Sequence, residues 1–332
     1  MKNIIVISTA IFFIIFAVFL FNVLKNTSKN KEEIVTVRVC KVIEHEALNS
    51  VVLGMSDYLK SQNKKYKIIV ETCQGNMALA SQILEKFASK SSLNKTNKKI
   101  MDIVVTIGTI PSQAAFKIAK DRRLRVVFSS VTNPIDISAD FANLKKNSNM
   151  TGVSNFVQLK PQLELFQKIQ PSLKKLGMLY NTGEANSTYI IKNIDPICKD
   201  MGITLIRQGI SKISELPQSI EKLAKNCDAV FISNDNMSLS GISNIISICS
   251  KYKIPVYVSD TDQVEKGCVA ALGPNQYDIG AQTGKIVKRI ADGEDINNIA
   301  IEYPKKTELY INLNTHLEIP DELISQAKKI FK

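Results

Sequence analysis

The fold class is decided by Asp102–Ile107, DIVVTI, together with the loop that follows it, Gly108–Gln113, GTIPSQ. The first stretch is a short apolar run of the kind found in strands that are buried on both faces of a parallel sheet. In the second, Pro111 suits the first turn of a helix that begins as the strand ends. A buried strand leading directly into a helix predicts an α/β protein with a parallel sheet.

The same unit recurs on both sides of this stretch. Upstream, residues 34–39 and 66–70 read as strands, and apolar residues at helical spacing follow each of them. Downstream the alternation restarts, so two such runs predict two doubly wound lobes with helices on both faces of each sheet. Further predicted strands cover residues 124–131, 176–180, 203–207, 229–233, 254–258 and 269–272, and predicted helices cover 47–59, 78–87, 111–120, 159–169, 189–201, 220–225, 239–251 and 277–291.

Length and composition agree with two globular lobes. The chain has 332 residues, which suits roughly two domains of about 150 residues each. Hydrophobic residues make up 45% and charged residues 22%, which argues against a disordered chain and against a protein with many membrane spans. The net charge is +12, but the lysines are scattered as doublets without interleaved aromatic residues or a preceding helix-turn-helix. We therefore expect a solvated basic surface and no nucleic-acid partner.

The first 33 residues predict a location outside the cytoplasm. Residues 4–24 are almost entirely apolar, with Lys2 before them and Lys25, Lys29 and Lys31 after them. At about 1.5 Å per residue this run can span a hydrocarbon core of about 30 Å. It is longer than the usual apolar part of a cleaved signal peptide, and no A-x-A-like site follows it. We expect residues 1–33 to be an export signal that remains as a membrane anchor, followed by a linker.

The cysteines and histidines give little support for a metal site. The sequence has no C-x-x-C, and only His45 and His316 could supply an imidazole. For most of the cysteines we expect a role as small buried hydrophobic residues, while their redox state is left open because disulfides require spatial proximity. These residues are Cys40, Cys73, Cys198, Cys227, Cys249 and Cys268.

Polar side chains follow the predicted strands at the positions where a doubly wound sheet binds its ligand. Ligands of such sheets lie beyond the carboxyl ends of the strands. Five post-strand loops hold hydroxyl, amide and carboxylate groups, which together can accept from an ammonium and donate to a carboxylate. The alternative is that these side chains only cap turns and helices. The candidate ligand-binding residues are Thr109, Ser112, Thr132, Asn133, Glu184, Asn186, Ser187, Asp235, Asn236 and Asp260.

No catalytic motif competes with a binding function. The sequence contains no G-x-S-x-G, no P-loop, no H-E-x-x-H and no strand-linked G-x-G-x-x-G. Neither histidine is placed near a recognisable Ser or Cys partner. We therefore expect no enzymatic activity, no catalytic residues, no cofactor and no metal.

Eight stretches spread along the chain form a recognisable series. They are IEHEALN at 43–49, GTIPSQAA at 108–115, SVTNP at 130–134, MTGVSN at 150–155, LGMLYNTGEANS at 176–187, DAVFISNDN at 228–236, PVYVSD at 255–260 and NQYDIGAQTG at 275–284. Together they resemble the ABC-transporter substrate-binding proteins that include the aromatic amino-acid, tryptophan-type receptors. That family usually has Asp at the position of Asn133 and a lipobox Cys near its N-terminus, and this sequence has neither.

The resemblance implies a type I periplasmic-binding fold, in which two lobes joined by three crossing strands close on a ligand. The implied first lobe is residues 34–152 with 274–304, and the second is 153–273 with 305–332. The implied partners are a small-molecule ligand and the permease and ATPase subunits of an ABC importer. Alternatives are a membrane-tethered ligand sensor and a sugar or nucleoside receptor of the same fold.

The expected ligand is an amino acid with an aromatic or large apolar side chain. Its ammonium would pair with Asp260, helped by Asp235 or Glu184, because a buried ammonium needs a carboxylate partner. Its carboxylate would meet the groups around Thr109, Ser112, Thr132 and Ser187.

Overall fold

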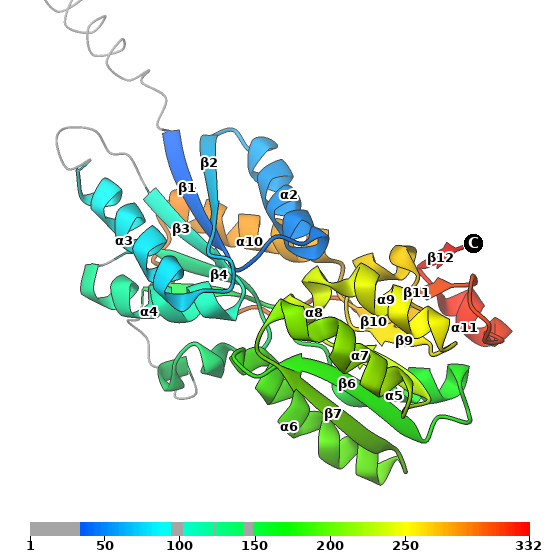
Figure 1. Ribbon diagram of the computed structural model, residues 1–332. Helices are drawn as coiled ribbons and strands as arrows, with labels where there is room; N and C mark the ends of the chain where they lie inside the picture. The colour runs from blue at the N-terminus through cyan, green and yellow to red at the C-terminus, as the bar shows by residue number, and fades with distance from the viewer. Residues whose placement is uncertain (1–33, 94–101, 123, 142–148) are drawn as a thin grey trace, which may run out of the picture.

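The computed structural model describes residues 34–93, 102–122, 124–141 and 149–332 (Figure 1). The predicted α/β class with two doubly wound lobes is confirmed, because each lobe is built on one mostly parallel sheet. The predicted signal or anchor in residues 1–33 lies outside the described residues and stays a prediction. Within the described ranges, no helix has both the length and the apolar character needed to cross a membrane.

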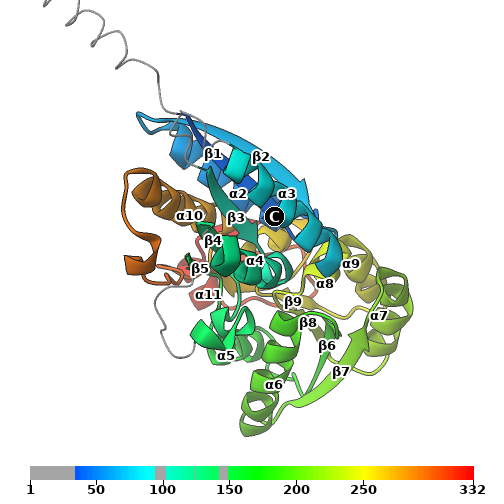
Figure 2. The same cartoon turned by 90° about the vertical axis from the view of Figure 1, so that its left-hand side faces the viewer.

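The sheet of the first lobe is entirely parallel, with the order β2-β1-β3-β4-β5. Helices α3 and α4 lie on one face of it, and α2 and α10 lie on the other (Figure 2). The strands are β1 (Ile34–Lys41), β2 (Lys65–Thr72), β3 (Asp102–Ile107), β4 (Val126–Val131) and β5 (Met150–Ser154), and the helices are α2 (Glu46–Lys60), α3 (Met77–Leu93), α4 (Thr109–Arg122) and α10 (Gln276–Ala291).

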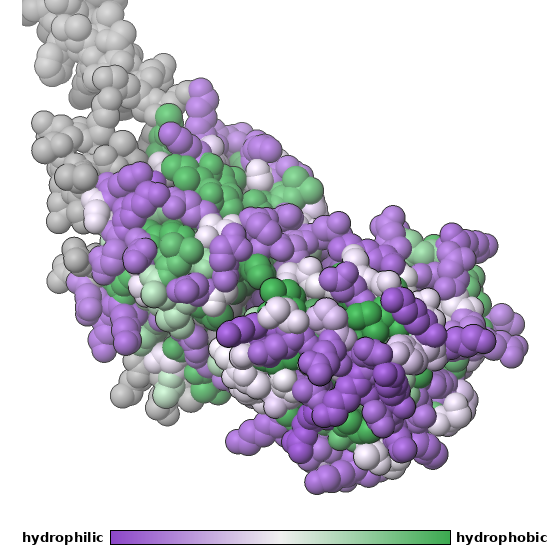
Figure 3. All heavy atoms as spheres, in the orientation of Figure 1, coloured by the Kyte–Doolittle hydropathy of each residue, from purple (hydrophilic) through white to green (hydrophobic). Residues whose placement is uncertain are grey.

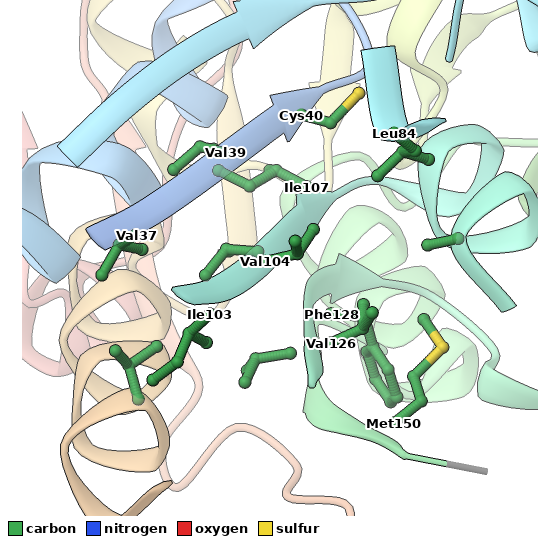
Figure 4. Packing of buried hydrophobic residues seen from close by; sticks show 14 of the residues in the cluster. Val37, Val39, Cys40, Leu84, Ile103, Val104, Ile107, Val126, Phe128 and Met150 are labelled. Atoms are coloured by element: carbon green, nitrogen blue, oxygen red, sulfur yellow. The ribbon is translucent and has the colours of Figure 1, made fainter. Parts of the chain in front are cut away.

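Apolar side chains on both faces of β3 and β4 form the core of the first lobe. Every residue of these two strands is buried, which explains why DIVVTI is a nearly continuous apolar run. Figure 4 shows Val37, Val39, Ile103 and Phe128 packed between the sheet and its helices. Each aliphatic side chain that is fully buried in this way contributes about 1.5–3 kcal/mol to stability.

The sheet of the second lobe has the order β12-β11-β10-β9-β8-β6-β7, and only the β10–β11 pair is antiparallel. Its strands are β6 (Lys175–Asn181), β7 (Thr204–Ile210), β8 (Ala229–Ile232), β9 (Val256–Val258), β10 (Ala270–Gly273), β11 (Glu308–Asn312) and β12 (Lys329–Phe331). Its helices are α5 (Leu159–Ile169), α6 (Ala185–Asp200), α7 (Leu216–Ala224), α8 (Asn236–Ser240), α9 (Ile242–Lys251) and α11 (Asp321–Gln326), with the short 3₁₀ segment η4 at Thr261–Lys266.

Alternation along the strands divides the core of the second lobe between the two faces of its sheet. Phe231 packs with α5 and α6 on one face, whereas its neighbours Val230 and Ile232 pack with α7 and α9 on the other. On the first of these faces the rings of Phe166 and Tyr257 are stacked with centroids 4.3 Å apart. Both faces of the sheet are therefore covered, as expected for parallel strands joined by helices.

The surface of both lobes is mainly polar, as Figure 3 shows for one face. Many of its basic residues lie in exposed ion pairs, such as Lys86 with Glu71 at 2.8 Å and Arg289 with Glu294 at 2.6 Å. Pairs of this kind contribute only about 0–1 kcal/mol each. The arrangement is that of the solvated basic surface expected from the scattered lysines.

The described chain passes between the lobes three times. It leaves the first sheet after β5, returns between β10 and α10, and leaves again after Glu302, which forms a parallel bridge with Val153. We propose the lobe boundaries implied by the sequence, residues 34–152 with 274–304 and residues 153–273 with 305–332. Each proposed boundary lies inside one of these three passages or within two residues of one.

Some local predictions were wrong. The single helix expected over 239–251 is two helices, because Gly241 has non-helical dihedral angles of φ −101° and ψ 12°. Helix α6 begins at Ala185, four residues before the predicted start. Strand β5 was not predicted; its Gly152 packs directly on Phe128, an arrangement that depends on the neighbouring strand.

Burial confirms the role as small hydrophobic residues that was expected for most of the cysteines. All six lie in the described part of the chain, where each is buried and none forms a disulfide.

Two glycines allow α2 and α10 to pack backbone to backbone. A Cβ atom at Gly54 would lie 2.0 Å from the carbonyl oxygen of Tyr277, and one at Gly280 would lie 2.0 Å from that of Val51. Real Cβ atoms do not approach backbone oxygens so closely, so a larger residue at either position would push the two helices apart. The contact therefore fixes the position of α2 against α10.

Overpacking by Gly280→Ala should cost about 2–3 kcal/mol, the upper part of the usual range, because the clash is with a backbone oxygen. Ala in a helix interior returns about 1 kcal/mol, so we expect the free energy of unfolding to fall by about 1–2 kcal/mol. Gly183→Ala is the control, since its Cβ would be 3.4 Å from the nearest atom. Urea unfolding measures both variants, and equal stability of the two would contradict the close helix contact.

Candidate ligand-binding site

A pocket lies between the lobes at the carboxyl ends of the strands. The cavity itself is small, about 20 Å³, and lies within about 340 Å³ of unfilled space that includes the open mouth. Five of the ten predicted site residues line it, namely Thr109, Thr132, Asn186, Asn236 and Asp260. The other lining residues are His45, Ala47, Leu48, Ser130, Asn155, Asn234, Leu239 and Gln276.

The first lobe contributes hydroxyl groups and a helix N-terminus. Thr109 is the first residue of α4 and follows Gly108, whose φ of +96° turns the chain sharply out of β3. The free N–H groups and the dipole at this helix start favour a negative charge. Ser130 and Thr132 lie at the end of β4, and the Thr132 hydroxyl is 3.4 Å from Oδ1 of Asn155.

Two predicted residues of the first lobe stabilise the turns behind the pocket wall. The Ser112 hydroxyl donates to the carbonyl oxygen of Gly108 at 2.7 Å and lies 2.9 Å from the Thr106 hydroxyl. Asn133 caps the short helix at Pro134–Asp136 by accepting from the N–H of Ile135. Neither side chain lines the pocket, and their bonds suit a structural role.

On the second lobe, the buried carboxylate of Glu184 orients the amides of the pocket wall. It accepts from Nδ2 of Asn181 at 3.0 Å, of Asn186 at 3.1 Å and of Asn236 at 2.6 Å. Burial and the charge of Asp235 raise the pKa of Glu184 above its usual range. Glu184 therefore lies behind the wall and fixes the two asparagines that form it.

Asp235 and Ser187 belong to a second network within the same lobe. Asp235 accepts from the N–H of Asn181, the hydroxyl of Ser187 and the N–H of Ser238, all within 2.7 Å. The last of these bonds caps α8. Asp235 does not line the pocket, so its expected help in holding an ammonium finds no support in its position, and its bonds suit a structural role.

Asp260 is the carboxylate that reaches the pocket. It is 1% exposed and caps η4, with Oδ1 accepting from the N–H of Asp262 and Oδ2 from Nε2 of Gln263 at 2.9 Å. Burial, aided by the charge of Asp262, raises the pKa of Asp260 to about 7. Lys266, whose charge favours ionised Asp260, is paired at 2.8 Å with Glu46. Asp260 thus combines the turn-capping and the pocket-lining roles.

His45 lines the pocket and was missed as a ligand-binding candidate. Its Nε2 lies 3.5 Å from Oδ1 of Asn236 on the other lobe, and burial lowers its pKa to about 4. His45 lies in the loop after β1, and the rule that ligands lie beyond the carboxyl ends of the strands applies to that loop as well as to the five loops that supplied candidates. Ser130 was missed because it lies inside the strand predicted over 124–131 and not in the loop after it.

The arrangement suits a zwitterion with an apolar side chain. A buried carboxylate and the amide oxygen of Asn186, which is unpaired in the described structure, lie on one wall, and hydroxyls and a helix N-terminus lie on the other. Ala47, Leu48 and Leu239 add apolar surface. Among the residues that the structure describes, no cluster of three or more His, Cys, Asp or Glu side chains could hold a metal ion.

Proteins of known sequence or structure share this architecture. A tyrosine-binding protein of Clostridioides difficile is 26% identical over 295 residues, which are 88% of this chain and 82% of that protein. A conserved domain protein of Vibrio cholerae is 28% identical with a TM-score of 0.81, covering 89% of this chain and 99% of that chain. The ABC domain from Streptococcus pneumoniae in complex with L-Trp is 24% identical with a TM-score of 0.80, covering 90% and 99%.

Nearly the whole described chain matches one protein family. Residues 36–330 match the family described as ABC transporter substrate binding protein, and this range includes both sheets and every residue of the pocket. The resemblance read from the sequence motifs is therefore confirmed. The chain belongs to the ABC transporter substrate-binding proteins.

Proposed function

We propose that this chain is the extracytoplasmic receptor of an ABC importer and that it binds an amino acid with an aromatic or large apolar side chain. As a member of a substrate-binding family it is a solute receptor and not an enzyme. The proposed partners are the permease and ATPase subunits of the importer. The observation that carries the amino-acid proposal is the fully buried Asp260 on the pocket wall.

Asp260 favours a cationic group in the pocket. A carboxylate buried without a partner charge is costly, and an ammonium placed beside it would compensate that cost. Oδ1 of Asn186 is buried in the same wall and has no hydrogen-bond partner in the described structure, so it offers a second acceptor. We therefore propose that the ligand's ammonium lies against Asp260 and Asn186.

The opposite wall suits the carboxylate of the same ligand. Thr109, Ser130 and Thr132 supply hydroxyls, and the first turn of α4 supplies backbone N–H groups. Ligand contacts on both walls would favour the closed arrangement of the lobes over an open one, because only the closed state makes both sets of contacts. The tyrosine that the Clostridioides difficile relative is named for has the same two charged groups.

A sugar or nucleoside receptor of the same fold is the second candidate. Asn155, Asn186, Asn234, Asn236 and Gln276 line the pocket, and amides are suitable partners for hydroxyl groups. A neutral polyol, however, gives no charge compensation to Asp260. Loss of that carboxylate therefore separates the two candidates. A membrane-tethered sensor would use the same pocket and differ in its partner and its retained anchor.

We expect Asp260→Asn to weaken amino-acid binding by roughly 2–4 kcal/mol, the scale of truncating one member of a buried charge pair. Asn can still cap η4, so the thermal midpoint of the ligand-free protein should change little. Asp295→Asn is the matched control, because Asp295 caps another 3₁₀ segment in the same way away from the pocket. Titration calorimetry measures all three proteins, and undiminished affinity in Asp260→Asn would remove the ammonium assignment.

Amino-acid affinity should depend on pH through Asp260. Its pKa of about 7 in the free protein means that much of the population is protonated below neutral pH. An ammonium favours the ionised form, so binding at pH 6 should release a proton, and affinity should fall about tenfold from pH 8 to pH 6. Calorimetry in buffers of different ionisation enthalpy detects the proton. Asp260→Asn should show neither effect, and a wild-type affinity that is constant over this range would contradict the assignment.

A further inference from the structure

His45 lines the pocket and carries an unused hydrogen-bond acceptor. The residue is 9% exposed, and in the described structure its Nδ1 is buried without a hydrogen-bond partner. Its other ring nitrogen, Nε2, faces Oδ1 of Asn236 across the cleft at 3.5 Å. A buried polar atom without a partner costs free energy unless something else, such as a ligand, satisfies it.

The hydrogen bonds of the second lobe determine which ring nitrogen carries the proton. Nδ2 of Asn236 donates to Glu184 at 2.6 Å, so the amide oxygen is the atom that faces His45. An oxygen can only accept, and therefore Nε2 of His45 must donate. Burial keeps the ring neutral by lowering its pKa to about 4. Nδ1 is consequently a bare lone pair, which can only accept from an N–H or O–H group.

The position of His45 points to the side chain of the ligand. His45 precedes Ala47 and Leu48 at the start of α2, and its partner Asn236 lies one turn before Leu239 on α8. These three apolar residues form the apolar part of the pocket lining. Lys41 and Lys266 both disfavour a positive charge on His45, whereas Glu44 favours one. The charges of the two lysines therefore also disfavour a ligand ammonium beside His45.

We propose that His45 is a specificity-determining residue whose Nδ1 accepts a hydrogen bond from an N–H or O–H group on the ligand's side chain. The proposal rests on the amino-acid function proposed above and narrows its ligand class. A phenol or an indole N–H would satisfy Nδ1, whereas a hydrocarbon side chain would bury it unpaired. The receptor should therefore discriminate against a side chain that has similar size but lacks the donor.

The full-length protein can be titrated with L-tyrosine, L-tryptophan and L-phenylalanine. We expect the wild type to bind the better of the two donor-bearing amino acids at least tenfold more tightly than phenylalanine. In His45→Gln the amide nitrogen can replace Nε2 and donate to Asn236, but no acceptor remains at the position of Nδ1. The affinities of this variant for the donor-bearing amino acid and for phenylalanine should then differ by no more than about twofold. His45→Asn is the matched control, because its amide oxygen can take the position of Nδ1 and should retain a preference.

The outcomes distinguish this proposal from the function on which it rests. If none of the three amino acids binds the wild type, the amino-acid function fails and the role of His45 fails with it. If phenylalanine binds the wild type as tightly as both others, the amino-acid function stands and the role of His45 is wrong. An undiminished preference in folded His45→Gln would also overturn it. The comparison of the three amino acids on the wild-type protein tests the role of His45 even if a variant does not fold.

Discussion

Two carboxylates buried in the second lobe, Glu184 and Asp235, must accept hydrogen bonds, and this requirement orders the wall of the pocket. Each is almost completely excluded from water, and an ionised group in such a place is stable only when donors surround it. Glu184 fixes the amides of Asn186 and Asn236, and Asp235 fixes the start of α8. The side chains that face the ligand are therefore oriented before the ligand arrives, so binding need not order them.

The two lobes contribute different chemistry to one pocket. The first supplies hydroxyls and the start of α4, which suit an anion, and the second supplies Asp260 and amide oxygens, which suit a cation. Neither wall alone is complementary to both ends of a zwitterion. Both ends of the proposed zwitterionic ligand could be satisfied only when the walls face each other, which would link recognition to the relative position of the lobes.

The sequence predicted the fold, and five of its ten candidate residues line the pocket, whereas the other pocket residues depended on information that only packing supplies. Buried runs such as DIVVTI identify parallel strands, and the rule of post-strand loops located Thr109 and Asp260. Ser112 and Asp235 carry the same functional groups and also follow strands, but their side chains turn toward backbone groups of their own lobe. Which way such a side chain turns is decided by neighbours that are distant in the sequence. His45 was missed because its loop was not searched, although the same rule applied to it.

The close contact at Gly54 and Gly280 has a mechanical consequence. Helix α2 begins beside His45 and α10 begins at Gln276, so two pocket residues are carried by one pair of helices whose backbones touch. Because α10 also follows directly after a passage between the lobes, a rotation of one lobe against the other should move this helix pair as one unit. His45 and Gln276 should then keep their relative positions, so this side of the pocket should keep its shape when the lobes move.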